Sequence, residues 1–188
     1  MTGNDIITNA KLIYPVDTFL PKANMVGLLN MAREKVNKLM QLSYTEYSFK
    51  TVANEWRYYL DRNFYEIHRV TVDIGNSLVI PVERVNEGEF PLRDTFYTHP
   101  VVYAFTPMNK ITLYPAPDID YDVYLYGYTQ LGFNYTVTNL NDTDVIPDNF
   151  LEPISFELAR RIAIYDQNYE LSGFLTQEFY NHLRINKI

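Results

Sequence analysis

The amino-acid sequence predicts an α+β protein: a helical bundle of N-terminal and C-terminal helices with an inserted antiparallel β-sheet. Apolar residues recur at helical spacing near both ends of the 188-residue chain. Between them lie short segments rich in Val, Ile and Tyr and bounded by Gly, Pro, Asn or Asp, which are typical of strands. We therefore predict one domain, residues 1–188, built from helical parts 1–60 and 148–188 and a β-rich insertion at about 61–147.

The N-terminal helical part is predicted to contain two helices, at residues 5–13 and 24–42. Pro15 ends the first helix, because the residue before a proline disfavours helical backbone. The second helix has one apolar face, formed by Met25, Leu28, Leu29, Ala32, Val36, Leu39 and Met40. This face predicts burial against other helices.

The predicted strands are segments 66–73, 78–85, 101–106, 110–115 and 121–128. The gaps between them are too short for crossover helices, which favours antiparallel pairing, and residues 106–109 resemble a hairpin turn. In the last segment alternate residues face opposite sides, with Tyr121, Val123 and Leu125 on one and Asp122, Tyr124 and Tyr126 on the other.

The C-terminal part is predicted to form a helix over 149–171 and a final helix over 174–186, separated by Ser172 and Gly173. Leu175, Phe179 and Leu183 form one apolar stripe on the final helix. The stripe either packs on helix 149–171 in the core or docks on a partner, and the pattern alone leaves both open.

The charge is acidic and unevenly distributed. Sixteen Lys and Arg stand against 23 Asp and Glu, a net charge of −7 that disfavours a clamp on nucleic-acid phosphates. No basic residue lies between Lys110 and Arg160, whereas the same stretch holds eight acids: Asp118, Asp120, Asp122, Asp142, Asp144, Asp148, Glu152 and Glu157. This run is either a solvated surface that aids solubility or a surface that repels a polyanion.

Aromatic content is the second unusual feature, with 17 Tyr and 11 Phe. A Tyr ring buries apolar area while its hydroxyl stays hydrated or hydrogen-bonded. This composition suits a half-exposed sheet or a surface that another subunit covers.

The sequence contains no complete motif for the types of catalysis and metal binding considered below. The absence of Cys excludes thiolate chemistry, and no His-Glu-x-x-His helix is present. Asp118, Asp120 and Asp122 resemble the opening of a calcium loop, but Val123 and Thr129 replace its required Gly and Glu. We expect no enzymatic activity, no cofactor and no metal. The short apolar runs and the N-terminus predict neither a membrane span nor an export signal.

Three parts of the chain resemble tailed-bacteriophage adaptor proteins. Residues 110–117 followed by 121–128 resemble a strand pair of these proteins, in which an aliphatic–Tyr–Pro–x–Pro element precedes a Tyr-rich strand. Residues 158–163 resemble the centre of a later helix, and residues 28–32 resemble the early helix. In this order the segments resemble a head-to-tail connector adaptor, of the tail accessory factor or head-completion type, from short-tailed phages (podoviruses).

The resemblance implies a structural virion protein that forms a twelvefold ring below the phage portal protein. The ring would extend the DNA channel and attach a distal tail or nozzle protein. Its implied partners are the portal, neighbouring copies of itself and that tail component, while DNA passes during ejection without specific binding. The implied location is the head-tail junction of the virion, with assembly in the host bacterial cytoplasm and no membrane contact. The alternatives are a virion-associated glycan-binding module and a cell-wall hydrolase.

Two sets of site residues accompany this interpretation. The C-terminal segment is the expected portal-binding site, with Phe179, Leu183, Arg184, Ile185, Lys187 and Ile188. The expected channel-facing acids are Asp142, Asp144 and Asp148.

Overall fold

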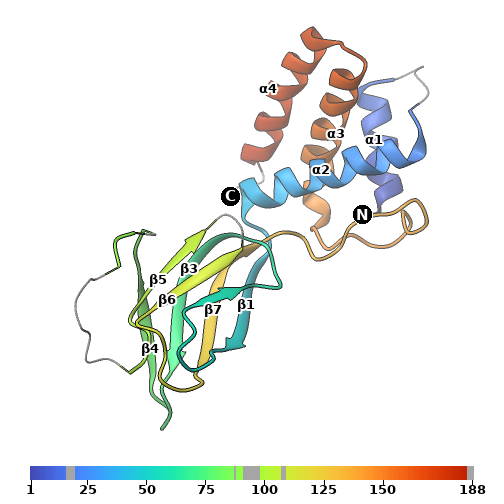
Figure 1. Cartoon of the computed structure of the whole chain (residues 1–188). Coiled ribbons are helices and arrows are strands. Elements are labelled where there is room, and N and C mark those ends of the chain that lie inside the picture. Colours follow the sequence, from blue (N-terminus) through green and yellow to red (C-terminus); the bar gives the residue numbers. More distant parts are fainter. Residues whose placement is uncertain (16–19, 87, 91–97, 107–108, 186–188) are drawn as a thin grey trace. The chain divides into compact units, whose positions relative to one another are not determined.

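The computed structural model describes residues 1–15, 20–86, 88–90, 98–106 and 109–185. The chain divides into two compact units, each with its own hydrophobic core (Figure 1). The helical unit comprises residues 1–42 and 131–188, and the sheet unit comprises residues 43–130. Helices and strands are both present, as the α+β prediction requires, but the bundle and the purely antiparallel sheet are wrong.

The helical unit contains α1 (Gly3–Ile13), α2 (Lys22–Met40), the short 3₁₀ helix η1 (Asp148–Phe150), α3 (Leu151–Tyr165) and α4 (Tyr169–Ile185). A capping box starts α1, in which the Thr2 side chain accepts a hydrogen bond from the backbone N–H of Asp5 while the Asp5 carboxylate accepts one from the backbone N–H of Thr2. The core of this unit includes Leu29 on α2, Leu158 on α3 and Phe179 on α4, all fully buried.

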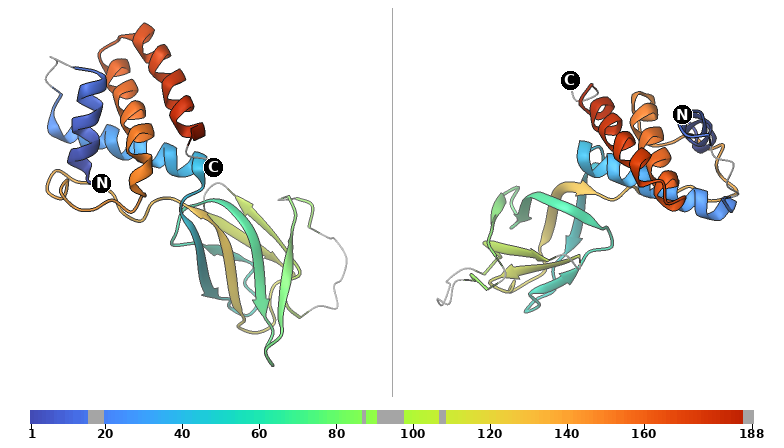
Figure 2. Two further views of the ribbon diagram at one scale, coloured as in Figure 1. Left: turned by 180° about the vertical axis from the view of Figure 1, so that it is seen from behind. Right: turned by 90° about the horizontal axis from the view of Figure 1, so that it is seen from above.

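The helices do not form the predicted bundle. In Figures 1 and 2, α1, α3 and α4 lie side by side, and α2 runs across this layer. Apolar periodicity shows which face of a helix is buried, but it does not give the angle at which two helices cross. Part of α2 also contacts the irregular segment 131–144, through Asn30, Arg33 and Glu34, so its neighbours are not helices alone.

The boundary between α3 and α4 also differs from the prediction. Ser172 and Gly173 lie inside α4, and the break falls at residues 166–168. Gln167 there has left-handed backbone, with φ of 60°. The Asn168 side chain accepts a hydrogen bond from the backbone N–H of Leu171 and so caps the start of α4. The polar run Asp166–Gln167–Asn168 therefore makes the turn.

The sheet unit contains β1 (Tyr44–Lys50), β2 (Arg57–Tyr59), β3 (Phe64–Asp73), β4 (Val79–Arg84), β5 (Val102–Thr106), β6 (Lys110–Tyr114) and β7 (Asp122–Thr129). They form one curled sheet in the order β1-β7-β3-β4-β5-β6-β2 (Figure 1). The curl brings Phe49 of one edge strand to Tyr58 of the other, with ring centroids 5.0 Å apart. Strands β1 and β2 lie in a stretch that we assigned to the helical part. Thr45, Tyr47 and Phe49 are half-buried and alternate with Glu46, Ser48 and Lys50, and this alternation of residue types is the period-two signal that would have identified β1.

One strand pair is parallel. Strand β4 pairs with β5 in parallel, and the other pairs of the sheet are antiparallel. Residues 85–101 connect β4 to β5, and this link is long enough to return the chain to the start of the neighbouring strand, as a parallel pair requires. The predicted hairpin turn at 106–109 includes residues 107–108, which lie outside the described residues.

Gly127 allows β7 to approach β3 closely. A β-carbon at this position would overlap the backbone carbonyl oxygen of Glu66, beside the bulges of β3. We expect Gly127→Ala to lower the free energy of unfolding by about 1–3 kcal/mol, measured by urea denaturation. Gly132→Ala is the control, because its β-carbon would meet nothing within 4 Å. Equal stability of the two variants would contradict the close approach.

Candidate functional site

The outer side of strands β1, β7 and β3 carries a half-exposed aromatic surface, which we call the tyrosine face. Its members are Tyr44, Glu46, His68, Arg69, Tyr124, Tyr126 and Tyr128. The burial pattern of β7 alternates along the strand, so the predicted separation of Val123 and Leu125 from Tyr124 and Tyr126 is confirmed. The inner residues fill the core of the curled sheet.

Cross-strand pairing builds the tyrosine face. Tyr44 lies opposite Tyr128, and their ring centroids are 5.1 Å apart in an edge-to-face arrangement. The ring centroids of His68 and Tyr128 are 5.0 Å apart, and the guanidinium carbon of Arg69 lies 5.7 Å from the centre of the Tyr126 ring. Burial raises the pKa of Tyr126, and the nearby Glu46 carboxylate raises it further. The face therefore presents aromatic rings that carry hydroxyl groups, a chemistry suited to protein interfaces.

The predicted portal-binding residues occupy different environments. Phe179 and Leu183 are buried in the core of the helical unit, which favours the core interpretation of the apolar stripe. Arg184 and Ile185 are exposed at the end of α4, whereas Lys187 and Ile188 lie outside the described residues. A docking role for this segment stays a prediction, now limited to side chains beyond the core.

The three predicted channel acids do not form one exposed set. Asp142 and Asp148 are exposed, and Asp148 pairs with the Met1 amino group. The Asp144 side chain has no exposed area and forms an ion pair with Arg33, which is also fully buried. Asp144 therefore has a structural role as the partner of Arg33, which its place in the acidic run did not indicate.

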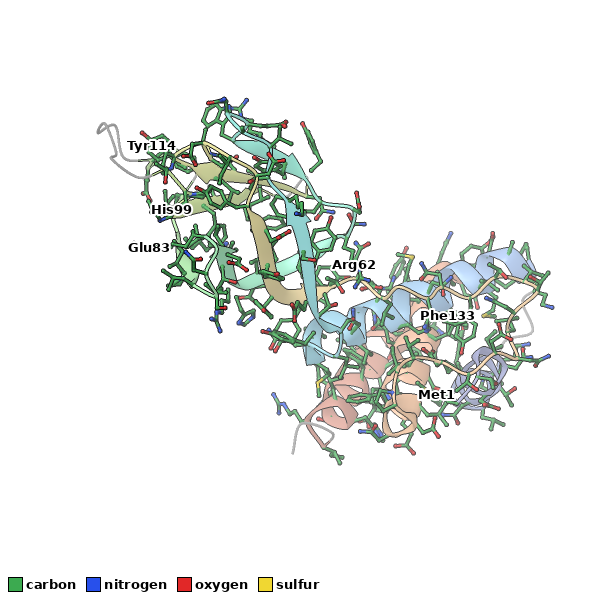
Figure 3. The ribbon with its side chains drawn as sticks, turned by 90° about the horizontal axis from the view of Figure 1, so that it is seen from below. Met1, Arg62, Glu83, His99, Tyr114 and Phe133 are labelled. Atoms are coloured by element: carbon green, nitrogen blue, oxygen red, sulfur yellow. The ribbon has the colours of Figure 1, made fainter. Side chains whose placement is uncertain are left out.

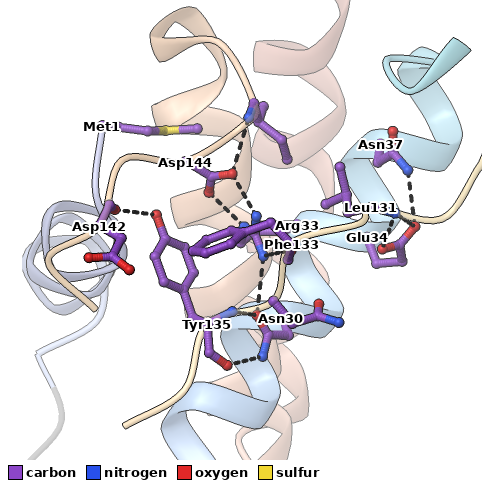
Figure 4. Close-up of polar contacts among 12 residues, drawn as sticks. Met1, Asn30, Arg33, Glu34, Asn37, Leu131, Phe133, Tyr135, Asp142 and Asp144 are labelled. Atoms are coloured by element: carbon purple, nitrogen blue, oxygen red, sulfur yellow. Dashed lines mark hydrogen bonds and ion pairs between the residues drawn. The ribbon is translucent and has the colours of Figure 1, made fainter. Parts of the chain in front are cut away.

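Arg33 organises the irregular segment that follows the sheet unit (Figure 4). Its Nε donates to Oδ2 of Asp144 and its Nη2 donates to Oδ1, both at 2.6 Å. The third nitrogen donates to the carbonyl of Phe133 at 3.1 Å and to the Asn30 side chain at 3.2 Å. The guanidinium carbon lies 4.6 Å from the centre of the Tyr135 ring. Burial, followed by the nearby Asp144 carboxylate, raises the pKa of the Tyr135 hydroxyl.

Asn30 completes this site through the backbone of Tyr135. It donates to the Tyr135 carbonyl at 2.8 Å and accepts from the Tyr135 N–H at 2.9 Å. Figure 3 shows Phe133 and Met1 among the side chains of the helical unit. The arrangement ties residues 133–144 to α2, so its role is to hold a segment without regular structure in place.

A second charged cluster surrounds Glu157 on α3. We define the Glu157 cluster as Glu157, Lys35, Arg160 and Arg161. The fully buried carboxylate meets Lys35 Nζ at 2.9 Å, Arg160 Nη2 at 2.7 Å and Arg161 Nε at 2.8 Å. Burial alone would raise the pKa of Glu157, but hydrogen bonds from Arg160 and Lys35 outweigh it and hold the pKa below its ordinary value of 4.5.

This lowered pKa makes part of the stability depend on pH. The unfolded Glu157 carboxyl binds a proton more readily than the folded one, so its stabilisation is present above pH 4.5. That contribution is lost as the pH falls through the folded pKa. We expect Glu157→Gln to flatten the pH dependence of the melting temperature below pH 4.5, measured from pH 3 to 7 by circular dichroism. An unchanged profile would show that the ion pairs of Glu157 do not stabilise the fold.

The acidic run of the sequence is divided between the two units. Asp118, Asp120 and Asp122 belong to the sheet unit, and the other five acids belong to the helical unit. Several of them have local partners: Asp122 pairs with Lys50, and Glu152 pairs with His182 at 2.9 Å. The run is therefore not one surface within either unit.

The histidines lie in separate surroundings. His68 belongs to the tyrosine face, His99 contacts Tyr121, and His182 stacks on Phe156. In the part of the chain that the structure describes, no three His, Asp or Glu side chains gather to hold a metal ion. Over the same residues, no helix combines the length and apolar character needed to cross a bilayer.

An α+β chain that exposes an aromatic sheet face and uses several of its charges in ion pairs has the character of an assembly protein. The comparison with known families supports this class. The model of the SU10 adaptor protein family matches residues 1–186, so the chain belongs to that family. It is a bacteriophage adaptor protein, a structural component of the virion. A search of curated proteins found no match.

Proposed function

We propose that this adaptor is the subunit of a twelvefold ring that binds below the phage portal at the head-tail junction. The ring would extend the DNA channel and attach the distal tail or nozzle protein. The observation that carries the proposal is the family match over residues 1–186. The net charge of −7 is compatible with DNA passing through the ring without being retained on its wall.

The direct experiment is assembly on the portal encoded by the same phage. Purified adaptor is mixed with portal rings, and the product is weighed by native mass spectrometry. We expect the portal mass to rise by twelve copies of the 22.1 kDa chain. An unchanged portal mass over a wide range of adaptor concentrations would contradict the proposal.

The tyrosine face supports a contact between the adaptor and another protein. Tyr44 is 55% exposed although its ring packs on Tyr128, so the pair offers apolar area that remains available. We expect Tyr44→Ala combined with Tyr128→Ala to weaken assembly on the portal about tenfold or more, because central aromatic residues contribute most to interface affinity.

The control for this prediction is Tyr59→Ala. Tyr59 lies on β2 and is 74% exposed, so the substitution removes an equally accessible ring from another strand. Circular dichroism checks that all variants fold. If the Tyr44/Tyr128 variant assembled on the portal as the wild type does, the tyrosine face would not take part in that assembly.

A further inference from the structure

Each unit carries one local cluster of charges that its own side chains leave unbalanced, and the two clusters have opposite signs. In the Glu157 cluster, three cations surround one carboxylate. Arg160, Arg161 and Lys35 form no ion pair with another acid among the described residues. The cluster therefore keeps two positive charges in a chain whose net charge is −7.

The three cations of the cluster are partly exposed. The side chains of Lys35, Arg160 and Arg161 are 25%, 18% and 17% exposed. Glu157 accepts hydrogen bonds from Nε and one terminal nitrogen of Arg160, whereas Nε of Arg161 lies 2.8 Å from its carboxylate in an ion pair without hydrogen-bond geometry. Within the described structure, the remaining guanidinium nitrogens have no hydrogen-bond partner, and their planar geometry matches a carboxylate. Ile164, one turn along α3 and 39% exposed, adds an apolar rim.

The sheet unit carries a local cluster of negative charge at one end. Residues 43–130 contain twelve Asp and Glu against seven Lys and Arg. We define the acidic tip as Asp73, Asp120, Asp122 and Ile119, which line one hollow of the surface. Asp73 and Asp122 lie directly opposite each other on β3 and β7, a like-charge pair that destabilises a sheet. Lys50 is the one cation that pairs with these acids among the described residues.

The two patches also match in their apolar parts. Ile119 is 56% exposed between two acids, as Ile164 is exposed beside two arginines. A closed ring of identical subunits needs a heterologous interface, in which two different and complementary patches of each subunit meet. Contact between the two patches would reduce the repulsion among the cations of the Glu157 cluster and among the carboxylates of the acidic tip.

We propose that the Glu157 cluster of one adaptor binds the acidic tip of a second copy of this chain in the ring. The inference rests on the proposed function, because it needs the ring. Arg161 and Lys35 would contact Asp73 and Asp120 of the neighbour, with Ile164 packing on the neighbour's Ile119.

The absence of Cys from the chain allows a direct test. Ile164→Cys and Ile119→Cys place one thiol in each patch and leave every charge of both patches intact. The two single variants are mixed, assembled on the portal and treated with a short bis-maleimide crosslinker. We expect mixed dimers of Ile164→Cys with Ile119→Cys on a denaturing gel and no dimers from either variant assembled alone.

The matched control pair is Leu12→Cys with Tyr59→Cys, two exposed positions on α1 and β2 that the proposed contact does not include. Rings of correct mass that fail to give the mixed dimer, or that give it no more than the control pair, would overturn the inference and leave the proposed function standing. If the unsubstituted chain formed no ring on the portal, both would be wrong.

Charge reversal gives an independent measurement. Asp73→Lys combined with Asp120→Lys removes the repulsion between Asp73 and Asp122 but also two exposed hydrogen bonds, from the N–H groups of Gly75 and Ala53. We expect the variant to fold, and circular dichroism checks this before assembly is measured. Ring assembly on the portal should then require about tenfold or more adaptor, and the unsubstituted ring should weaken as salt is added. Unchanged assembly by this folded variant would contradict the contact.

Discussion

Replacing Arg33 with Ala is expected to lower the free energy of unfolding by about 3–5 kcal/mol, because it leaves the Asp144 carboxylate buried without its partner. The side chains of both residues have no exposed area, and both hydrogen bonds between them are 2.6 Å long. The change also removes the hydrogen bonds that Arg33 donates to the Phe133 carbonyl and to the side-chain oxygen of Asn30. Chemical denaturation followed by circular dichroism measures the change.

The double variant Arg33→Met with Asp144→Leu separates the charge effect from packing. It removes both charges and keeps apolar volume, so we expect it to be more stable than Arg33→Ala. Lys11→Ala, at an exposed position of α1, is the control for removal of a cation. A change below about 1 kcal/mol for Arg33→Ala would show that the pair contributes no more than a surface ion pair.

Truncating Phe179 to Ala should cost about 3–5 kcal/mol, since its ring is fully buried in the helical core. The Lys35 ammonium lies 4.4 Å from the centre of this ring, so the same change removes a cation–π contact. Thermal denaturation should show a clear drop in melting temperature. The expectation opposes a docking role, in which the monomer would lose binding and keep its stability.

Ile185 supplies the control on the same helix. It is 68% exposed at the end of α4, and Ile185→Ala should change the free energy of unfolding by less than about 0.5 kcal/mol. If this variant folds normally and fails to join the portal, the C-terminal segment is a docking site through its exposed residues. If Phe179→Ala keeps full stability, the assignment of Phe179 to the core is wrong.

Sequence reasoning located the helices well where their apolar periodicity was long. The predicted helix 24–42 corresponds to α2, and the predicted strand 121–128 corresponds to β7 with the expected division of its faces. It missed β1, where only Tyr47 and Phe49 are apolar among the inward-facing residues, so the period-two pattern is short and weak. It also placed the final helical break at Ser172–Gly173, although the polar run 166–168 makes the turn.

The candidate sites could be predicted from the sequence less well than the fold. The acidic run suggested one charged surface, but Asp144 and Glu157 are buried and paired with cations on α2 and α3. Arg33 and Asp144 are 111 residues apart in the chain, and neither belongs to a motif that names its partner. The tyrosine face was accessible to prediction in part, because the alternation of β7 is local, whereas Tyr44 and His68 join it from two other strands.

The sequence by itself determined the α+β class, the positions of most helices and strands, the two faces of β7 and the likeness to phage adaptors. Each of these depends on the order and spacing of residues within one short segment. Only the tertiary structure decided the crossing of α2 over the other helices, the parallel pairing of β4 with β5 and the partners of Arg33 and Glu157. These depend on which distant segments meet, and local periodicity carries no information about the partner that a buried face or charge will find.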